Sequence, residues 1–299
     1  MTITTDELKQ FLITDGARAD LHLHSNASDG KLSPAEVVAA ARERGVVLLA
    51  LTDHDTCDGI KEAVEAVQAC TEHNVHMTTG IEISTIWRGR EIHIVGLCFD
   101  PNHPAMTSLL EKQKKLRDDR ARAIGEKLEK CGFKDAYQKT REMAGNTATI
   151  TRGNYTAYLY SVGAAETMNQ CFAKYLAEGR KAYVRAQWCS VEDAVNAVNL
   201  AGGIAVLAHP RSYDLNNKWL RMLITDFKNA GGEAMEVSGS LQSPADRDFL
   251  QVLSVEYELF ASCGSDFHRE CKYISIGGGG RLPDRVNPVW NHKKFKLEV

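Results

Sequence analysis

The sequence has no long apolar run, no paired cysteines and no secretory leader. No stretch of the 299 residues approaches the roughly 18 consecutive apolar residues that a membrane-spanning helix needs. The N-terminal segment MTITTDELKQ lacks the basic start and apolar core of a signal peptide. The 8 cysteines form no Cys-x-x-Cys pair, which argues against a thiolate zinc site or a dithiol redox site. We therefore expect a soluble, cytoplasmic protein without membrane contact.

Charge is nearly balanced over the whole chain but not along it. The net charge is −3, yet residues 101–190 carry 16 Lys/Arg against 9 Asp/Glu, a net of +7. The remaining residues carry 20 basic and 30 acidic side chains, a net of −10. A basic segment in an otherwise acidic chain favours a polyanionic substrate.

Short apolar runs alternate with helical patterns over the first hundred residues, which predicts parallel strands joined by helices. Residues 33–45 predict a helix with Ser33 as N-cap, Pro34 in the first turn and Gly45 after its end. Residues 59–73 predict a second helix. The runs GIEIS and EIHIVGL predict two further strands, separated by a turn at WRGR.

The pattern becomes helical from residue 101. A long charged helix is expected first, with an apolar side formed by Leu109, Leu116, Ile124 and Leu128. The next strand signal is AYV at 182–184, and the strand–helix alternation then resumes. We therefore predict an α/β barrel built from residues 1–100 and 188–299, with a mainly helical insertion over residues 101–187.

Side chains that bind metals recur within or directly after the predicted strands. His22 and His24 lie two apart on a strand, so their imidazoles project from the same face. The carboxyl ends of strands in a parallel barrel form the face where active sites are assembled. A carboxylate between isoleucines, such as Glu82, is costly to bury unless a cation or strong hydrogen bonds compensate it. A metal centre is therefore predicted from His22, His24, Asp53, His54, Asp55, Glu82, His93, His209, Asp266 and His268 or a subset of them.

The other four histidines do not follow this pattern. For His73, His76, His103 and His292 we expect surface or loop positions.

Six strings resemble one known family in order. DLHLHSNASDG, LTDHDT, GIEIS, EIHIVG, AHP and GSDFH, between residues 19 and 268, closely resemble the PHP (polymerase and histidinol phosphatase) superfamily. The chain is most similar to the bacterial branch that acts on nucleoside 3′,5′-bisphosphates and on RNA 5′ ends. That branch also carries a helical insertion. The string TRGNY resembles part of that insertion, and WCSVEDA resembles the point where the chain returns to the barrel. The resemblance implies a distorted (βα)₇ barrel that holds up to three divalent metal ions.

The resemblance also implies a ligand set. His22, His24, Glu82 and Asp266 would bind the first metal, Glu82 would bridge to the second with His93 and His209, and Asp29, His54 and His268 would hold the third. Many members have histidine where Asp29 stands, which is a departure from the family pattern. Asp53 and Asp55 are expected to orient His54 and its neighbours. Ligands of this kind suit manganese first, with iron or zinc as alternatives.

The expected chemistry follows from charge. Three divalent ions would bring six positive charges against three from Asp29, Glu82 and Asp266, and this surplus favours a phosphate ester. A metal-bridging hydroxide is the expected nucleophile. The resemblance makes Arg152 the expected clamp for a second phosphate, with Lys181 and Arg211 as weaker candidates. Relatives often have His-Pro-Gly-Arg where this chain has His209-Pro210-Arg211-Ser212.

The insertion interleaves basic residues with aromatic ones, which is typical of single-strand nucleic-acid binding. Composition alone leaves this open, because charged helix faces are commonly solvated and tyrosines are commonly buried. The favoured hypothesis is a phosphatase on 3′,5′-bisphosphorylated nucleotides that also trims RNA stepwise from its 5′ end.

Two alternatives remain. A small-molecule phosphatase of the histidinol-phosphate type needs no basic, aromatic insertion. A non-catalytic PHP module tends to lose ligands, whereas each expected position here holds a competent residue. No obligate protein partner is indicated.

Overall fold

A computed structural model describes residues 7, 12, 18–70, 75–145, 149–240, 242–279 and 281–298. Its strands form one mixed sheet in the order β1-β2-β3-β4-β6-β7-β8, with β5 paired beside β3. The strands are β1 Arg18–Leu23, β2 Val46–Leu51, β3 His76–Trp87, β4 Arg90–Leu97, β5 Cys189–Ser190, β6 Ile204–Leu207, β7 Ala234–Gly239 and β8 Phe260–Gly264.

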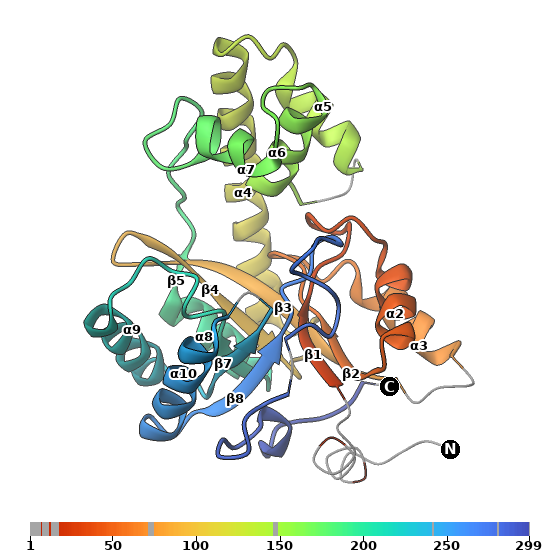
Figure 1. Ribbon diagram of the computed structural model, residues 1–299, viewed down its shortest axis with the longest axis vertical. Coiled ribbons are helices and arrows are strands. Elements are labelled where there is room, and N and C mark those ends of the chain that lie inside the picture. Colours follow the sequence, from red (N-terminus) through yellow and green to blue (C-terminus); the bar gives the residue numbers. More distant parts are fainter. Residues whose placement is uncertain are drawn as a thin grey trace.

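The sheet curls until its first strand meets the segment after its last. The His24 N–H donates to the Phe267 carbonyl over 2.9 Å, and the Asp266 N–H donates to the His22 carbonyl over 3.0 Å. These bonds bring the two edges together, so the sheet forms a nearly closed barrel (Figure 1). The seven strands on this path confirm the expected distorted barrel with a helical insertion.

The strand directions are mixed, so the expectation of an all-parallel barrel is wrong at β4. This strand pairs antiparallel with both β3 and β6. A two-residue turn at Arg88 and Gly89, with φ angles of 48° and 83°, connects β3 to β4. Two successive positive φ angles form the turn type that closes tight hairpins. The WRGR turn was therefore predicted correctly, but its consequence for strand direction was not.

Helices cover the outside of the barrel, and their ends follow local capping rules. Helix α2 (Pro34–Glu43) begins after Ser33, whose side chain accepts the Glu36 N–H in a capping box. Gly45 then takes the left-handed backbone with φ of 72°, as predicted. Helix α3 (Ile60–Gln68) is shorter than expected, and residues 71–74, with His73, lie outside the described part of the chain. The other outer helices are α8 Val191–Leu200, α9 Asn217–Asn229 and α10 Pro244–Glu256.

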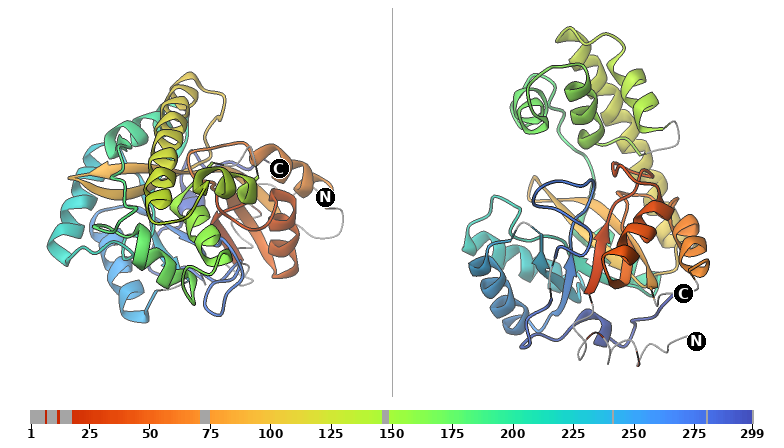
Figure 2. Two further views of the ribbon diagram at one scale, coloured as in Figure 1. Left: turned by 90° about the horizontal axis from the view of Figure 1, so that it is seen from above. Right: turned by 45° about the vertical axis from the view of Figure 1, so that its right-hand side comes forward.

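The insertion stands over one end of the barrel, carried by a long helix (Figures 1 and 2). That helix, α4 (Pro104–Lys130), is followed by α5 (Ala136–Ala144), α6 (Arg152–Ser161), α7 (Met168–Cys171) and a π-helical turn at Phe172–Leu176. They enclose an apolar core of their own, which includes Ile124, Leu128, Tyr155, Leu159 and Leu176.

The return segment to the barrel forms no strand at 182–184, contrary to expectation. Side chains of α4 bind its backbone instead. Lys127 Nζ donates to the Tyr183 carbonyl over 2.5 Å, and Arg120 Nε donates to the Val184 carbonyl over 3.0 Å. These contacts satisfy carbonyls that would otherwise need a neighbouring strand.

Candidate metal centre

Six histidines and two further carboxylates gather around Glu82 at the end of the barrel beneath the insertion. Glu82 is completely buried. Its Oε1 lies 2.8 Å from His93 Nδ1 and 2.9 Å from His209 Nε2. Its Oε2 lies 3.3 Å from His22 Nε2, 3.2 Å from His24 Nε2 and 3.0 Å from His54 Nδ1. One carboxylate is therefore shared by five imidazoles.

Three overlapping groups of possible ligands lie within this cluster, each with its donor atoms within 4.8 Å of one another. The first contains the four residues that the resemblance implied for one metal. The second group contains Glu82 and His93, as the resemblance implied, together with His54 in place of the implied His209. His209 contacts the same Glu82 oxygen as His93. The third contains the implied trio with His24 added. The groups are His22-His24-Glu82-Asp266, His54-Glu82-His93 and His24-Asp29-His54-His268.

Strand geometry explains why these residues meet. The β3–β4 register pairs Ser84 with His93, and Glu82 lies two residues before Ser84 on the same face. His93 therefore enters the cluster from within a strand, as its position between Ile92 and Ile94 predicted, although that strand is antiparallel to its neighbours. His209 and Asp266 follow β6 and β8 with positive φ angles of 28° and 53°. Such backbone is costly for residues other than glycine and is often found at functional sites.

The donor atoms of the cluster fit divalent cations. Burial alone would raise the pKa of Glu82, but the charges of His93, His22 and His54 outweigh it and hold that pKa well below its usual range. Among the described residues, His24 Nδ1, His54 Nδ1 and Glu82 Oε2 are buried and make no well-aligned hydrogen bond, although His54 Nδ1 and Glu82 Oε2 lie only 3.0 Å apart. Imidazole nitrogens and a carboxylate oxygen that converge in this way are compensated by a bound metal ion.

Glu236, on β7, supports the cluster and was not predicted. Its Oε1 lies 2.7 Å from His22 Nδ1, and its Oε2 accepts the His209 N–H over 2.5 Å. Carboxylates that bind the second nitrogen of a ligating histidine fix its tautomer and ring orientation. An acidic residue inside the apolar run AMEVSG is the same signal that identified Glu82, and it could have been recognised.

Asp53 and Asp55, which we expected to orient His54 and its neighbours, accept hydrogen bonds from groups around the cluster. Asp53 accepts hydrogen bonds from the Ser25 N–H over 2.8 Å and from the Ser28 hydroxyl over 2.6 Å. Asp55 accepts one from Arg117 Nε over 2.5 Å. The first carboxylate therefore holds the loop after β1, and the second anchors helix α4 to the end of β2.

An arginine-rich cavity adjoins the cluster. We call it the arginine pocket; its lining includes Arg117, Arg120 and Arg152 together with Asp29, His54, Glu91, His93, Phe172 and Trp188. The carbon centres of the Arg117 and Arg120 guanidinium groups lie 4.8 and 5.0 Å from the Trp188 ring. Arg152 lies 5.5 Å from the Phe172 ring and 3.1 Å from Glu91 Oε2. These contacts hold three cations beside the cluster.

Arg117 and Arg120 were missed by the sequence analysis, which placed Leu116 on the buried side of α4. The structure buries Leu109, Gln113, Arg117 and Ile124 on that side, while Leu116 is half-buried. Arg117 lies eight residues after Leu109 and seven before Ile124, so helical periodicity assigns it to the apolar stripe. A charged residue in that stripe was the available signal.

Comparison with known proteins agrees with this arrangement. The family model for the PHP domain matches residues 20–174. A 5′-3′ exoribonuclease of Haemophilus influenzae is 46% identical over 91% of this chain and 97% of its own length. A 3′,5′-nucleoside bisphosphate phosphatase of Chromobacterium violaceum is 37% identical over 94% of this chain and 98% of its own.

The chain belongs to the PHP family. These relatives are hydrolytic enzymes, and so is this PHP protein. A solved amidohydrolase from Chromobacterium violaceum, with bound sulfate and no metal, superposes with a TM-score of 0.86 at 38% identity. The superposition covers 92% of this chain and 95% of the other, so the shared fold includes the insertion.

The two weaker phosphate-binding candidates lie elsewhere in the PHP protein. Lys181 is exposed and lines neither the arginine pocket nor the other cavities described beside the cluster. Arg211 lies on the opposite side of the cluster, where its Nε donates to Asp246 over 2.7 Å.

The aromatic residues of the insertion divide between its own core and the arginine pocket. Tyr155 and Tyr158 are buried in the core of the insertion, and the Tyr155 hydroxyl donates to the Ala121 carbonyl over 2.6 Å. They cannot stack on bases. Phe172 and Trp188 line the arginine pocket, and the Tyr213 ring lies 5.3 Å from that of His209.

The histidines set aside from the site take mixed positions. His76 is the first residue of β3 and is buried, so the surface or loop position expected for it is wrong. His292 is only 5% exposed, so the surface position expected for it is wrong as well. His103 caps the start of α4, as a loop residue can.

Among the described residues, no helix is long and apolar enough to cross a membrane.

Proposed function

We propose that this PHP protein is a metal-dependent phosphoesterase that hydrolyses the 3′-phosphoester of nucleoside 3′,5′-bisphosphates. The same reaction at the first internucleotide linkage of 5′-phosphorylated RNA would release nucleotides stepwise from the 5′ end. The relatives named above carry these two activities. We also propose that it works in the cytoplasm.

We propose that His22, His24, Asp29, His54, Glu82, His93, His209, Asp266 and His268 hold up to three divalent ions, with manganese preferred over iron or zinc. When bound, such ions polarise a phosphoryl group and lower the pKa of water towards neutrality. Glu236 keeps the His22 ring in place through its 2.7 Å contact. The Thr151 hydroxyl, at the start of α6, donates to Asp29 over 2.6 Å, which ties the insertion to the third ligand group.

The observation that carries the proposal is that the arginine pocket adjoins the ligand cluster. The arginine pocket and the metal cluster share Asp29, His54 and His93 as lining residues. A substrate with two phosphate groups can therefore place one on the ions and the other among the guanidinium groups. Arginine suits this task because its planar donors match phosphate oxygens in pairs.

Glu91 prepares the arginine pocket for a phosphate. Burial alone would raise the pKa of Glu91, but the charges of Arg152 and Arg120 outweigh it and lower that pKa. The ionised carboxylate holds Arg120 over 2.9 Å and Arg152 over 3.1 Å. We infer that the 5′-phosphate contacts Arg152. Its side chain is 28% exposed, more than those of Arg117 and Arg120, the other two arginines of the pocket.

The test compares substrates with and without a 5′-phosphate on manganese-loaded protein. Arg152→Ala should lower kcat/KM for adenosine 3′,5′-bisphosphate and for 5′-phosphorylated oligoribonucleotides by roughly 10- to 100-fold, which is the range for losing hydrogen bonds to a charged group. Turnover of adenosine 3′-monophosphate and of 5′-hydroxyl RNA should change little. Arg122→Ala is the control, because Arg122 forms an exposed ion pair with Asp118 on α4 and is not among the residues that line the arginine pocket.

Histidinol phosphate is the substrate that separates the proposal from its alternative. Turnover of this compound equal to that of the bisphosphate, with no effect of Arg152→Ala, would reject the nucleotide substrate but keep the metal centre. Absence of all three activities in metal-loaded protein would support a non-catalytic role.

A further inference from the structure

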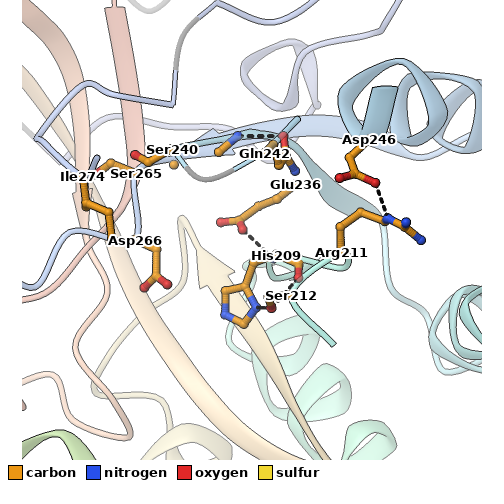
Figure 3. Close-up of a pocket in the computed structure, with 12 residues that line it drawn as sticks. His209, Arg211, Ser212, Glu236, Ser240, Gln242, Asp246, Ser265, Asp266 and Ile274 are labelled. Carbon is orange, nitrogen blue, oxygen red and sulfur yellow. Dashed lines mark hydrogen bonds and ion pairs between the residues drawn. The ribbon is translucent and has the colours of Figure 1, made fainter. Parts of the chain in front are cut away.

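A second cavity borders the metal cluster at His209, Glu236 and Asp266 (Figure 3), and it shares no lining residue with the arginine pocket. We call it the polar pocket; it is lined by His209, Arg211, Ser212, Glu236, Gly239, Ser240, Gln242, Asp246, Gly264, Ser265, Asp266 and Ile274. Asp266 and Arg211 lie on opposite sides of it in Figure 3. Asp266 is the most exposed carboxylate of the cluster, with 45% of its side chain accessible. The cluster is therefore open towards the polar pocket.

Charge distinguishes the two pockets, whereas size does not. Their volumes are similar, about 150 Å³ for the polar pocket and about 190 Å³ for the arginine pocket. Among the described residues that line the polar pocket, Arg211 is the one Lys or Arg, and its charge is balanced by Asp246 at 2.7 Å. Its guanidinium also lies 5.6 Å from the Phe249 ring. A free phosphate finds no unbalanced cation there.

The remaining lining suits a sugar or a base. Gln242 Oε1 accepts the Gly239 N–H over 2.9 Å, which fixes the side-chain amide, and no described residue accepts a hydrogen bond from its Nε2. The Ser240 hydroxyl is buried and without a partner among the described residues. Ile274 supplies an apolar wall. Uncharged donors beside an apolar surface are typical of pockets that orient a neutral ligand group.

We propose that the polar pocket binds the second nucleotide of an RNA substrate, which is linked through its 5′-oxygen to the phosphate at the cluster. This inference rests on the proposed function. In the reaction, a water oxygen bonds to phosphorus, the bond from phosphorus to the 3′-oxygen of the first nucleotide breaks, and that oxygen takes a proton. The first nucleotide leaves as a 5′-monophosphate, and the shortened RNA keeps the phosphate as its new 5′ end. A 3′,5′-bisphosphate has no second nucleotide and leaves the polar pocket empty.

The experiment measures kcat/KM for the 5′-phosphorylated dinucleotide pApA and for adenosine 3′,5′-bisphosphate, using manganese-loaded full-length protein. Gln242→Ala and Ile274→Ala should each lower the value for pApA about three- to tenfold, as expected for one lost contact to an uncharged group. The value for the bisphosphate should stay the same, which also shows that the variants fold and bind metal.

Arg269→Ala is the comparison variant, because Arg269 lines a different groove that borders the cluster at Asp29 and His268. Loss of pApA turnover in this variant alone would place the second nucleotide in that groove and overturn the inference. Equal losses on both substrates, or no loss on either, in both polar-pocket variants would overturn it as well. If wild-type protein hydrolyses neither substrate, the proposed function itself is wrong. That outcome differs from the failure of the polar-pocket inference, in which wild-type protein is active and the variants do not behave as expected.

Discussion

The buried ion pair between Arg117 and Asp55 should contribute strongly to stability. Asp55 Oδ2 accepts a hydrogen bond from Arg117 Nε over 2.5 Å, and the two side chains are 0% and 7% exposed, respectively. Removing one partner of a buried pair leaves an uncompensated charge and costs about 3–5 kcal/mol. Asp55 Oδ1 would still accept from the Ser84 N–H at 3.0 Å and from Gln113 Nε2 at 3.1 Å. We therefore expect Arg117→Met to lower the free energy of unfolding by about 3 kcal/mol, the lower end of that range.

Urea unfolding followed by circular dichroism measures this loss. Adding Asp55→Asn to Arg117→Met should recover about 1–2 kcal/mol, because the unpaired charge is then removed. The matched control is Arg122→Met on the same helix, where the pair with Asp118 is exposed and its loss should leave the free energy of unfolding nearly unchanged. A cost below about 1 kcal/mol for Arg117→Met would equal that of an exposed pair. That result, or no recovery in the double variant, would refute the reasoning.

Three further predictions concern the metal centre and the C-terminal segment. Glu236→Gln should weaken manganese binding about 10- to 100-fold, since an amide cannot accept from both His22 and the His209 N–H; unchanged affinity in a metal titration would contradict this. Chelation should abolish turnover and lower the unfolding midpoint. The expected loss is about 2.7 kcal/mol of unfolding free energy, compared with protein in a metal concentration of 100 times the Kd. A midpoint that does not change with metal would argue against the centre. Burial lowers the pKa of His292, whose Nδ1 accepts the Lys294 N–H, so its contribution to stability should be present above pH ~6.5 and lost as pH falls. His292→Gln should remove that part of the pH dependence in urea unfolding between pH 7.5 and 5.5, and an unaltered profile would exclude it.

Several features of the protein follow from local sequence and were predicted from it. Ser33 caps a helix because its hydroxyl reaches an N–H three residues away, and Gly45 ends that helix because it tolerates a positive φ. The convergence of eight of the nine expected ligands on one end of the barrel was also visible, because histidines and acids in or directly after apolar strands are costly to bury without compensation, whereas Asp29 was implied only by the family resemblance. That convergence does not by itself prove ligation, which stays a prediction for the metal titration to decide.

The remaining features depend on residues distant in sequence. Arg117 and Asp55 are 62 positions apart, and Glu236 and His22 are 214 apart, so only the folded chain shows that each buried charge has its partner. Asp53 was expected to serve His54, but the loop after β1 folds its serines onto that carboxylate first. Local sequence determines backbone geometry and burial through short-range sterics and periodicity. Pairing between distant polar groups is decided by tertiary structure, because a carboxylate accepts any donor that the fold brings within about 3 Å.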